Sequence, residues 1–389
     1  MLAWIAPLFV FAIVVFVHEL GHFLAAKAVG VYTPRFSVGF GRALFKKRWG
    51  ETEYVLAALP LGGYVRMASK DDEATAFLEG GSENAATQVT AEADKLDPNA
   101  MIPFGPKPIP EDRWLESKPL WARLVILLSG VTMNIILALV VTIGMLLYYG
   151  MPYVSTRTDT VLASRPAAMA GLLPGDSLVA INGVPLTSWD SLVTKISASA
   201  GTEVVFDVQR GGKSTRIPVT PALDTATSLS TGKLEHVGRI GILPKALARH
   251  VSFGEAITHG WSLTWGMAGS VIDALKGLAT RKVAPSELGG PIMIATASVQ
   301  AARGGLENLL VLIALISVNL AVFNLLPIPI LDGGQIMVNL LEAIKGSAFS
   351  VRTRDYILRV GLAAVLLLFA LVTYNDLRRL LVSIMRKFG

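Results

Sequence analysis

The sequence predicts a polytopic α-helical membrane protein with about four transmembrane helices, a membrane-associated β-hairpin and one inserted α+β domain. Of its 389 residues, 52% are hydrophobic and only 16% are charged, and the mean hydropathy is +0.54. Four long apolar segments could cross a bilayer, and between the second and third lies a stretch with the turns and short elements of a soluble domain. We divide the chain into a first transmembrane helix (1–30), a β-hairpin with an edge strand (31–67), a polar linker expected to be disordered (68–112), a second transmembrane helix (113–150), the soluble domain (151–246), an amphipathic interfacial segment (247–290), a third transmembrane helix (291–334), and a loop, fourth transmembrane helix and basic tail (335–389).

The first apolar segment, residues 2–29, carries the candidate catalytic residues. Its ionisable residues are His18, Glu19, His22 and Lys27. At about 1.5 Å per residue, a helix of this length can cross the hydrocarbon core of about 30 Å. Because an ionisable group at that depth is costly, these side chains are candidates for a function.

The spacing of these side chains indicates metal-dependent hydrolysis. On a helix, His18 and His22 lie one turn apart on the same face, so both imidazoles can reach one cation, and Glu19 is close enough to accept a proton from a water activated there. This is the H-E-x-x-H pattern of zinc hydrolases. One alternative is a chance match to the pattern, and another is a pair of core histidines that hydrogen-bond to neighbouring residues. A membrane accommodates such buried polar side chains far less readily than the core of a soluble protein does.

The other three apolar segments set the expected topology. Residues 124–149 and 309–326 contain no charge, whereas the fourth segment, 360–374, is short, so Arg359 and Asp376 should snorkel or lie at the interfaces. Basic residues follow the first segment and precede the second, which predicts a cytoplasmic loop between them and an external N-terminus. The basic tail fits this topology poorly. The N-terminal segment lacks a basic region and a cleavage site, so we expect a retained helix.

Residues 36–67 predict a β-hairpin that turns at Trp49-Gly50-Glu51 and a further extended strand. The strand includes Gly62, Gly63, Tyr64 and Val65, and an exposed strand edge beside a metal site could pair with an unwound substrate. A purely structural hairpin that caps the helices is the alternative. The acidic and then proline-rich stretch that follows is typical of a linker, and we assign it no chemistry.

The soluble stretch has a short helix near Pro166, a Gly-Asp pair, a strand, an Asn-Gly turn, a helix from about Trp189 and two further strands. This order resembles a PDZ domain of the bacterial protease type. The resemblance implies a peptide groove between that helix and Ile240, Gly241 and Ile242. The alternative is a spacer or size filter that binds no peptide. Residues 251–282 then predict an amphipathic segment on the membrane surface.

A third metal ligand is expected after the third apolar segment, in the run N-L-L-P-I-P-I-L-D-G-G at 324–334. A catalytic zinc typically has three protein ligands and keeps one position open. In the expected topology Asp332 lies at the same depth as His18 and His22, which makes it the best-placed acid. An ordinary helix-end carboxylate is the alternative.

These motifs, with Gly130 to Asn134 in the second segment, the strand at Gly62 to Val65 and the PDZ-like domain, resemble the site-2 protease family over nearly the whole chain. The similarity is greatest to the bacterial membrane zinc metalloproteases that cleave anti-sigma factors. It implies that His18, His22 and Asp332 bind one Zn²⁺, that Glu19 is the catalytic acid/base and that Asn324 contacts the substrate near the scissile bond. Two departures are the single PDZ-like domain, where many relatives carry two, and Val131 after Gly130, where proline is common.

By this resemblance the enzyme is a multi-pass protein of the bacterial inner (plasma) membrane, with the active site near the cytoplasmic side and an extracytoplasmic PDZ-like domain. Its substrate would be a single-span membrane protein already cut by another protease, such as an anti-sigma factor, or a remnant signal peptide. The partners implied are that substrate, the lipid bilayer and a peptide ligand of the PDZ-like domain.

Three other classes of function are weighed against a protease. A non-catalytic membrane adaptor with a structural metal would need a closed ligand set. A metal transporter would also use intramembrane histidine and aspartate, but we find no internal hydropathy repeat. The net charge of +6 could indicate nucleic-acid binding, but the basic residues flank apolar segments, so we expect no nucleic-acid partner. The chain has no cysteine, which excludes thiolate ligands and disulfides.

Overall fold

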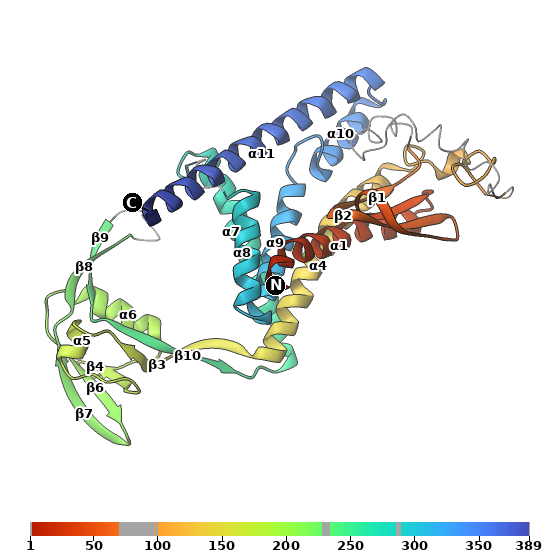
Figure 1. Ribbon diagram of the computed structural model, residues 1–389. Helices are drawn as coiled ribbons and strands as arrows, with labels where there is room; N and C mark the ends of the chain where they lie inside the picture. Colours follow the sequence, from red (N-terminus) through yellow and green to blue (C-terminus); the bar gives the residue numbers. More distant parts are fainter. Residues whose placement is uncertain (1, 70–96, 98–99, 228–233, 285–288, 389) are drawn as a thin grey trace. The chain divides into compact units, whose positions relative to one another are not determined.

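A computed structural model describes residues 2–69, 97, 100–227, 234–284 and 289–388 (Figure 1). It divides the chain into two compact units, Met1–Met145 with Gly254–Gly389, and Leu146–Phe253. Most of the expected linker at 68–112 lies outside the described residues.

The first unit contains four described helices that are long and apolar enough to span a membrane, as the sequence predicts. These are α1 (Ala6–Ala28), α4 (Leu120–Tyr149), α9 (Leu306–Asn324) and Arg352–Val382 within α11 (Val351–Phe388). The fourth is 31 residues long and so far exceeds the expected 360–374. The remaining helices of this unit are η1 (Leu2–Trp4), η3 (Glu111–Arg113), α7 (Phe253–Ala279), α8 (Pro291–Arg303) and α10 (Asp332–Lys345).

Asp376 on α11 has a structural partner and has no need to snorkel. Its carboxylate accepts hydrogen bonds from the backbone N–H groups of Gly290, at 3.0 Å, and Met293, at 2.9 Å, at the start of α8. A carboxylate at a helix N-terminus satisfies free N–H groups and interacts favourably with the helix dipole. Asp376 is accordingly only 4% exposed. The charge thus joins α11 to α8.

Helix α7 packs on α4 through a stripe of small buried residues spaced four apart, although the sequence suggests a helix lying along the membrane surface. Thr264 Oγ1 lies 3.2 Å from Thr142 Oγ1 on α4. A side chain at Gly260 would approach Ile143 to 2.6 Å, so only glycine permits this contact. Small residues and paired hydroxyls are typical of helix contacts in membranes. The stripe consists of Ala256, Gly260, Thr264 and Ala268.

Two long strands, β1 (Arg35–Trp49) and β2 (Thr52–Arg66), form the expected hairpin with its turn at Gly50 and Glu51. Their register is doubled. Residues 35–38 pair with 53–56 on one side and with 63–66 on the other. In the described part of the chain, the strand at residues 63–65 pairs with β1 alone, so it forms an edge of this sheet.

Glu51 holds this hairpin against the helices. Its carboxylate accepts two hydrogen bonds from the Arg113 guanidinium, at 2.7 and 2.8 Å, and a third from Lys27 at the end of α1. Burial raises the pKa of Glu51, but the hydrogen bonds from Arg113 and Lys27 outweigh it and hold the pKa below its usual value. The hairpin turn is therefore tied to α1 and to η3.

The second unit is built on one sheet with strand order β10-β3-β4-β6-β7, in which β5 pairs with β4, and on a separate β8-β9 pair. Helix α6 packs on a core that includes Leu178, Leu192 and Phe206. The helices and strands of the second unit are β3 (Met151–Val161), α5 (Pro166–Met169), β4 (Ser177–Ile181), β5 (Val184–Pro185), α6 (Trp189–Ala198), β6 (Val204–Arg210), β7 (Lys213–Val219), β8 (Ala222–Thr227), β9 (Leu234–Arg239) and β10 (Ile242–Arg249).

Asp176, before β4, is a buried charge in this unit. Its carboxylate is 1% exposed and accepts hydrogen bonds from Arg210, at 2.7 and 2.8 Å, and from the Leu173 N–H, at 2.8 Å. The Arg210 hydrogen bonds hold the pKa of Asp176 below its usual value, against the opposing effect of burial. Because the folded pKa lies below the unfolded value of about 3.9, this contribution is complete above that pH and declines as the pH falls towards the folded pKa.

We predict that Asp176→Asn lowers the local stability of β4 and β6 at pH 7. In the variant this local stability should fall less than in the parent when the pH drops below 4. The amide keeps the size of the side chain but loses the charge that pairs with Arg210. Hydrogen–deuterium exchange of β4 and β6 peptides in the full chain, corrected for intrinsic rates, measures this. Equal pH profiles in the variant and the parent would contradict the assignment. Asp190→Asn, at an exposed position in the first turn of α6, is the control.

Candidate metal centre

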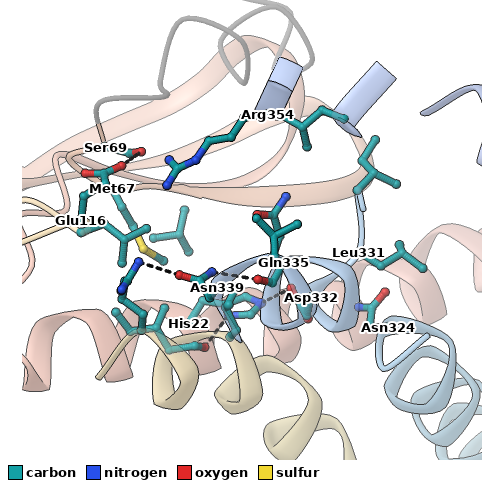
Figure 2. Close-up of a pocket in the computed structure, with 18 of the residues that line it drawn as sticks. His22, Met67, Ser69, Glu116, Asn324, Leu331, Asp332, Gln335, Asn339 and Arg354 are labelled. Atoms are coloured by element: carbon teal, nitrogen blue, oxygen red, sulfur yellow. Dashed lines mark hydrogen bonds and ion pairs between the residues drawn. The ribbon is translucent and has the colours of Figure 1, made fainter. Parts of the chain in front are cut away.

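Three candidate ligand side chains converge within the first unit. His18 and His22 lie on α1, and Asp332 is the first residue of α10. The two Nε2 atoms are 3.1 Å apart, and the Asp332 carboxylate oxygens lie 3.3 Å from His18 Nε2 and 3.5 Å from His22 Nε2. Figure 2 shows Asp332 facing His22 from the start of α10. Residues more than 300 positions apart in the sequence thus form one cluster.

The chain between α9 and α10 explains the position of Asp332. Helix α9 ends at Asn324, and Pro327 and Pro329 prevent the helix from continuing. Residue 333 must be glycine because a Cβ there would lie 2.3 Å from the Leu325 carbonyl oxygen. The start of α10 can therefore fold back onto the end of α9, which points the Asp332 carboxylate at the histidines.

Helix α4 forms the floor of the cluster. A Cβ at Gly21 would lie 2.4 Å from the Ser129 carbonyl oxygen, so α1 and α4 are in backbone contact. A Cβ at Gly130 would lie 2.4 Å from His22 Nε2 and 2.8 Å from His18 Cε1. Both imidazoles thus rest in a space that glycine leaves open.

The donor set fits a zinc ion. Ligand atoms at about 2.1 Å from a tetrahedral metal are separated by about 3.4 Å. The two Nε2 atoms are 3.1 Å apart, and each has a different Asp332 oxygen at 3.3 or 3.5 Å. Among the described residues, the buried Oδ2 of Asp332 has no hydrogen-bond partner. A buried acceptor without a donor is costly, and a cation between the three side chains would satisfy it. Two imidazoles and one carboxylate are a ligand set of catalytic zinc.

Glu19 lies between this cluster and the free edge of β2. It lines the same cavity as His18, His22 and Val65. A Cβ at Gly63 would lie 3.4 Å from Glu19 Cγ and 2.7 Å from the Ser37 carbonyl oxygen, so the strand passes directly beside Glu19. The expected strand edge is therefore in contact with the expected acid/base.

The cluster opens into a cavity of about 470 Å³. One part of its wall is apolar, and the part around α10 carries paired polar side chains, drawn in Figure 2. Arg123 donates to Asn339 at 2.8 Å, and Arg354 donates to Glu342 at 2.8 Å. Asn324 lies on the α9 side, with Nδ2 at 3.0 Å from His18 Nε2. Water and a polypeptide backbone could both be accommodated beside the cluster.

Most of the sequence-predicted site residues meet here. The predicted residues among those that line this cavity are His18, Glu19, His22, Tyr64, Val65, Asn324 and Asp332. Gly63 packs on Glu19, whereas Gly62 packs against Phe40, where a Cβ would lie 2.3 Å from the ring.

The expected groove residues belong to the second unit. Ile240 is 2% exposed, and its carbonyl accepts a hydrogen bond from the Ala167 N–H. The Gly241 carbonyl accepts from the Leu162 N–H, and Ile242 pairs with Val161. The backbone at Gly238 packs against α6, where a Cβ would lie 2.2 Å from the Ile196 carbonyl oxygen. These carbonyls are thus already paired within the unit, and peptide binding stays a prediction.

Sequence reasoning assigned no role to three positions on α4 that contact the histidines. These are the Ile126 carbonyl, which lies 2.8 Å from His22 Nδ1, Gly130, and Asn134, whose Nδ2 lies 3.4 Å from His18 Nδ1. The sequence offered two signals: Gly130 and Asn134 belong to a motif that carries the family resemblance, and the spacing of four equals that of the two histidines.

Comparison with known proteins agrees with this geometry. The family model described as peptidase family M50 matches residues 6–368. A Streptococcus pyogenes serotype M1 protein named "Putative zinc metalloprotease" is 33% identical, with 97% of this chain and 99% of that protein covered. The "Regulator of sigma-W protease RasP" of Bacillus subtilis is 29% identical, with 97% and 98% covered. A solved PDZ domain of an SdrC-like protein from Listeria innocua is 24% identical over 25% of this chain and 99% of its own, with a TM-score of 0.19, a likeness too weak to bear on the fold.

The family model covers the four predicted spans down to residue 368, together with both halves of the metal cluster. The full-length relatives carry zinc metalloprotease or protease names. The chain therefore belongs to peptidase family M50, the site-2 proteases, and is a membrane-embedded zinc metalloprotease.

Proposed function

We propose that this protease cleaves peptide bonds within the transmembrane segments of single-span membrane proteins, with one Zn²⁺ held by His18, His22 and Asp332. The observation that carries the proposal is the approach of these ligand atoms to within 4.8 Å of one another, with two of them in the middle of a candidate membrane span. Two ligands come from α1 and the third from α10, so the site exists only in the folded helical unit.

The residues around the cluster supply the other steps of hydrolysis. Bound zinc supplies Lewis acidity, which lowers the pKa of a water molecule and polarises a carbonyl group. Glu19 takes a proton from the attacking water and passes it to the leaving amine as the C–N bond breaks. Glu19 lines the same cavity as His18 and His22, so its carboxylate can reach a water molecule beside them. The polar wall near Arg123 and Asn339 admits water to an otherwise apolar region.

The free edge of β2 is our candidate for holding the substrate. A peptide bond in a transmembrane helix is shielded by the backbone hydrogen bonds of that helix, so the substrate must unwind locally and its freed groups need partners. Strand addition at Tyr64 and Val65 offers backbone partners, and the Asn324 amide offers one beside the cluster.

We further propose that the substrate has first been shortened by another protease, and that it is an anti-sigma factor or a remnant signal peptide. The name of the Bacillus subtilis relative, which refers to sigma-W, supports the first class. We place the enzyme in the bacterial inner (plasma) membrane, with the metal site towards the cytoplasm. The second unit is then extracytoplasmic and acts as a peptide-binding domain or a size filter.

We predict that Glu19→Gln lowers cleavage by about 10²–10⁴-fold, because the amide cannot take the proton, while zinc binding is retained. The assay is cleavage of a single-span substrate truncated on its extracytoplasmic side, by the purified full chain in detergent, with zinc measured by mass spectrometry. Glu307→Gln, at an exposed position in the first turn of α9, is the matched control. Full activity in Glu19→Gln would refute the role of Glu19.

We predict that Asp332→Asn weakens zinc binding by more than about 100-fold. Loss of a residue that only hydrogen-bonds to a ligand typically weakens metal binding by about 10–100-fold, and loss of a ligand should cost more. Zinc affinity is measured by competition with a chromophoric chelator. Asp355→Asn, an aspartate on α11 that pairs with exposed Arg359, is the control. Zinc occupancy unchanged by Asp332→Asn would remove this residue from the ligand set.

We predict that Gly63→Ala lowers the rate of cleavage by at least about tenfold and leaves zinc binding unchanged. The reason is that small displacements of reacting groups slow an enzymatic reaction strongly. The added Cβ would lie 2.7 Å from the Ser37 carbonyl oxygen, so residue 63 must shift from its present position beside Glu19. Gly144→Ala, on α4 where nothing lies within 4 Å of an added Cβ, is the control. Equal cleavage by the two variants would argue against a role for this strand.

A further inference from the structure

Asn134 is a fully buried polar residue that the hydrolytic steps above do not use. It is 0% exposed and lies on α4 at the contact with α1 and α9. Its side-chain Nδ2 lies 3.4 Å from His18 Nδ1, and its backbone carbonyl accepts a hydrogen bond from Ser317 Oγ on α9 at 2.8 Å. Among the described residues, its Oδ1 has no hydrogen-bond partner. A buried amide oxygen without a donor costs about 1–3 kcal/mol.

The neighbouring histidine shows what α4 does for an imidazole. His22 Nδ1 lies 2.8 Å from the Ile126 carbonyl oxygen, which can only accept, so the proton of neutral His22 is on Nδ1. The lone pair is then on Nε2, which faces Asp332. A hydrogen bond at one ring nitrogen thus makes the other a ligand.

His18 needs the same arrangement, and Asn134 is the residue at its Nδ1. If Nδ2 of Asn134 donates, His18 Nδ1 must accept, and the proton of neutral His18 is then on Nε2, 3.3 Å from Asp332 Oδ2. If the amide is turned by half a rotation, its oxygen accepts the Nδ1–H of His18. The lone pair is then on Nε2, and the amide oxygen has its donor.

We propose that Asn134 is a positioning residue for the metal site: its amide oxygen accepts the Nδ1–H of His18 and holds Nε2 unprotonated towards the metal. This inference rests on the proposed zinc site. The proposal gives a role to one face of α4, on which three residues lie at intervals of four. On this face Ile126 orients His22, Gly130 leaves room for both rings, and Asn134 orients His18.

The test is zinc affinity of the purified full chain, measured by chelator competition for three variants. Asn134→Leu keeps the size but has no acceptor, and Asn134→Asp restores an acceptor. Ser317→Ala removes the hydroxyl that contacts the Asn134 backbone, so it perturbs the same helix contact without touching His18. We expect Asn134→Leu to weaken zinc binding by about 10–100-fold, and Asn134→Asp and Ser317→Ala to stay within about threefold of the parent.

The outcomes separate this inference from the zinc site itself. A parent that binds no zinc would overturn both. A parent that binds zinc, with a folded Asn134→Leu of equal affinity, would overturn the role of Asn134 alone. Equal losses in all three variants would indicate a packing role and would also overturn it.

A measurement on the parent protein covers the case in which Asn134→Leu does not fold. The chain has five histidines, so ¹⁵N-histidine labelling gives few signals. In the zinc-loaded parent we expect a protonated Nδ1 on His18. An unprotonated Nδ1 would overturn the proposal, whatever the variants do.

Discussion

The backbone contact between α1 and α4 is the constraint on which the metal centre depends. At Gly21 the two helices touch, and at Gly130 the absence of a side chain leaves space for two imidazoles. Polar groups at this depth have little water to satisfy them, so their partners must come from protein. Helix α4 supplies these partners at the spacing of the histidines, which turns a costly placement into an oriented pair.

The third candidate ligand comes from an interruption of helical structure next to the cavity. Pro327 and Pro329 leave backbone carbonyls without helical partners, and the Gln335 side chain donates to the Pro329 carbonyl at 2.8 Å. Irregular backbone at membrane depth is tolerated where protein or a cavity satisfies it. The break that exposes the Asp332 carboxylate to the histidines is therefore stabilised by α10 itself.

The doubled register of β1 and β2 explains how a strand edge reaches the acid/base. Residues 35–38 are covered on both sides, which leaves 63–66 as the outer strand beside α1. Gly63 permits contact with Glu19 on α1. Glu51, which binds Lys27 and Arg113, ties the hairpin turn to the same helix. Helix α1 therefore contacts the strand at Glu19 and the hairpin turn at Lys27, and it also carries His18 and His22.

Local pattern alone was enough to predict the four spans, the hairpin turn at Gly50 and the His18, Glu19 and His22 spacing, because hydropathy and helical periodicity are properties of neighbouring residues. It also singled out Asp332, because this acid follows the third apolar segment and lies at the depth of the histidines in the expected topology. The partners of Asp376, the packing of α7 on α4 and the contacts of Asn134 were decided by the tertiary structure. Each of these joins residues at least 83 positions apart in the sequence. A pairing at that distance is set by how helices cross, which no local spacing encodes.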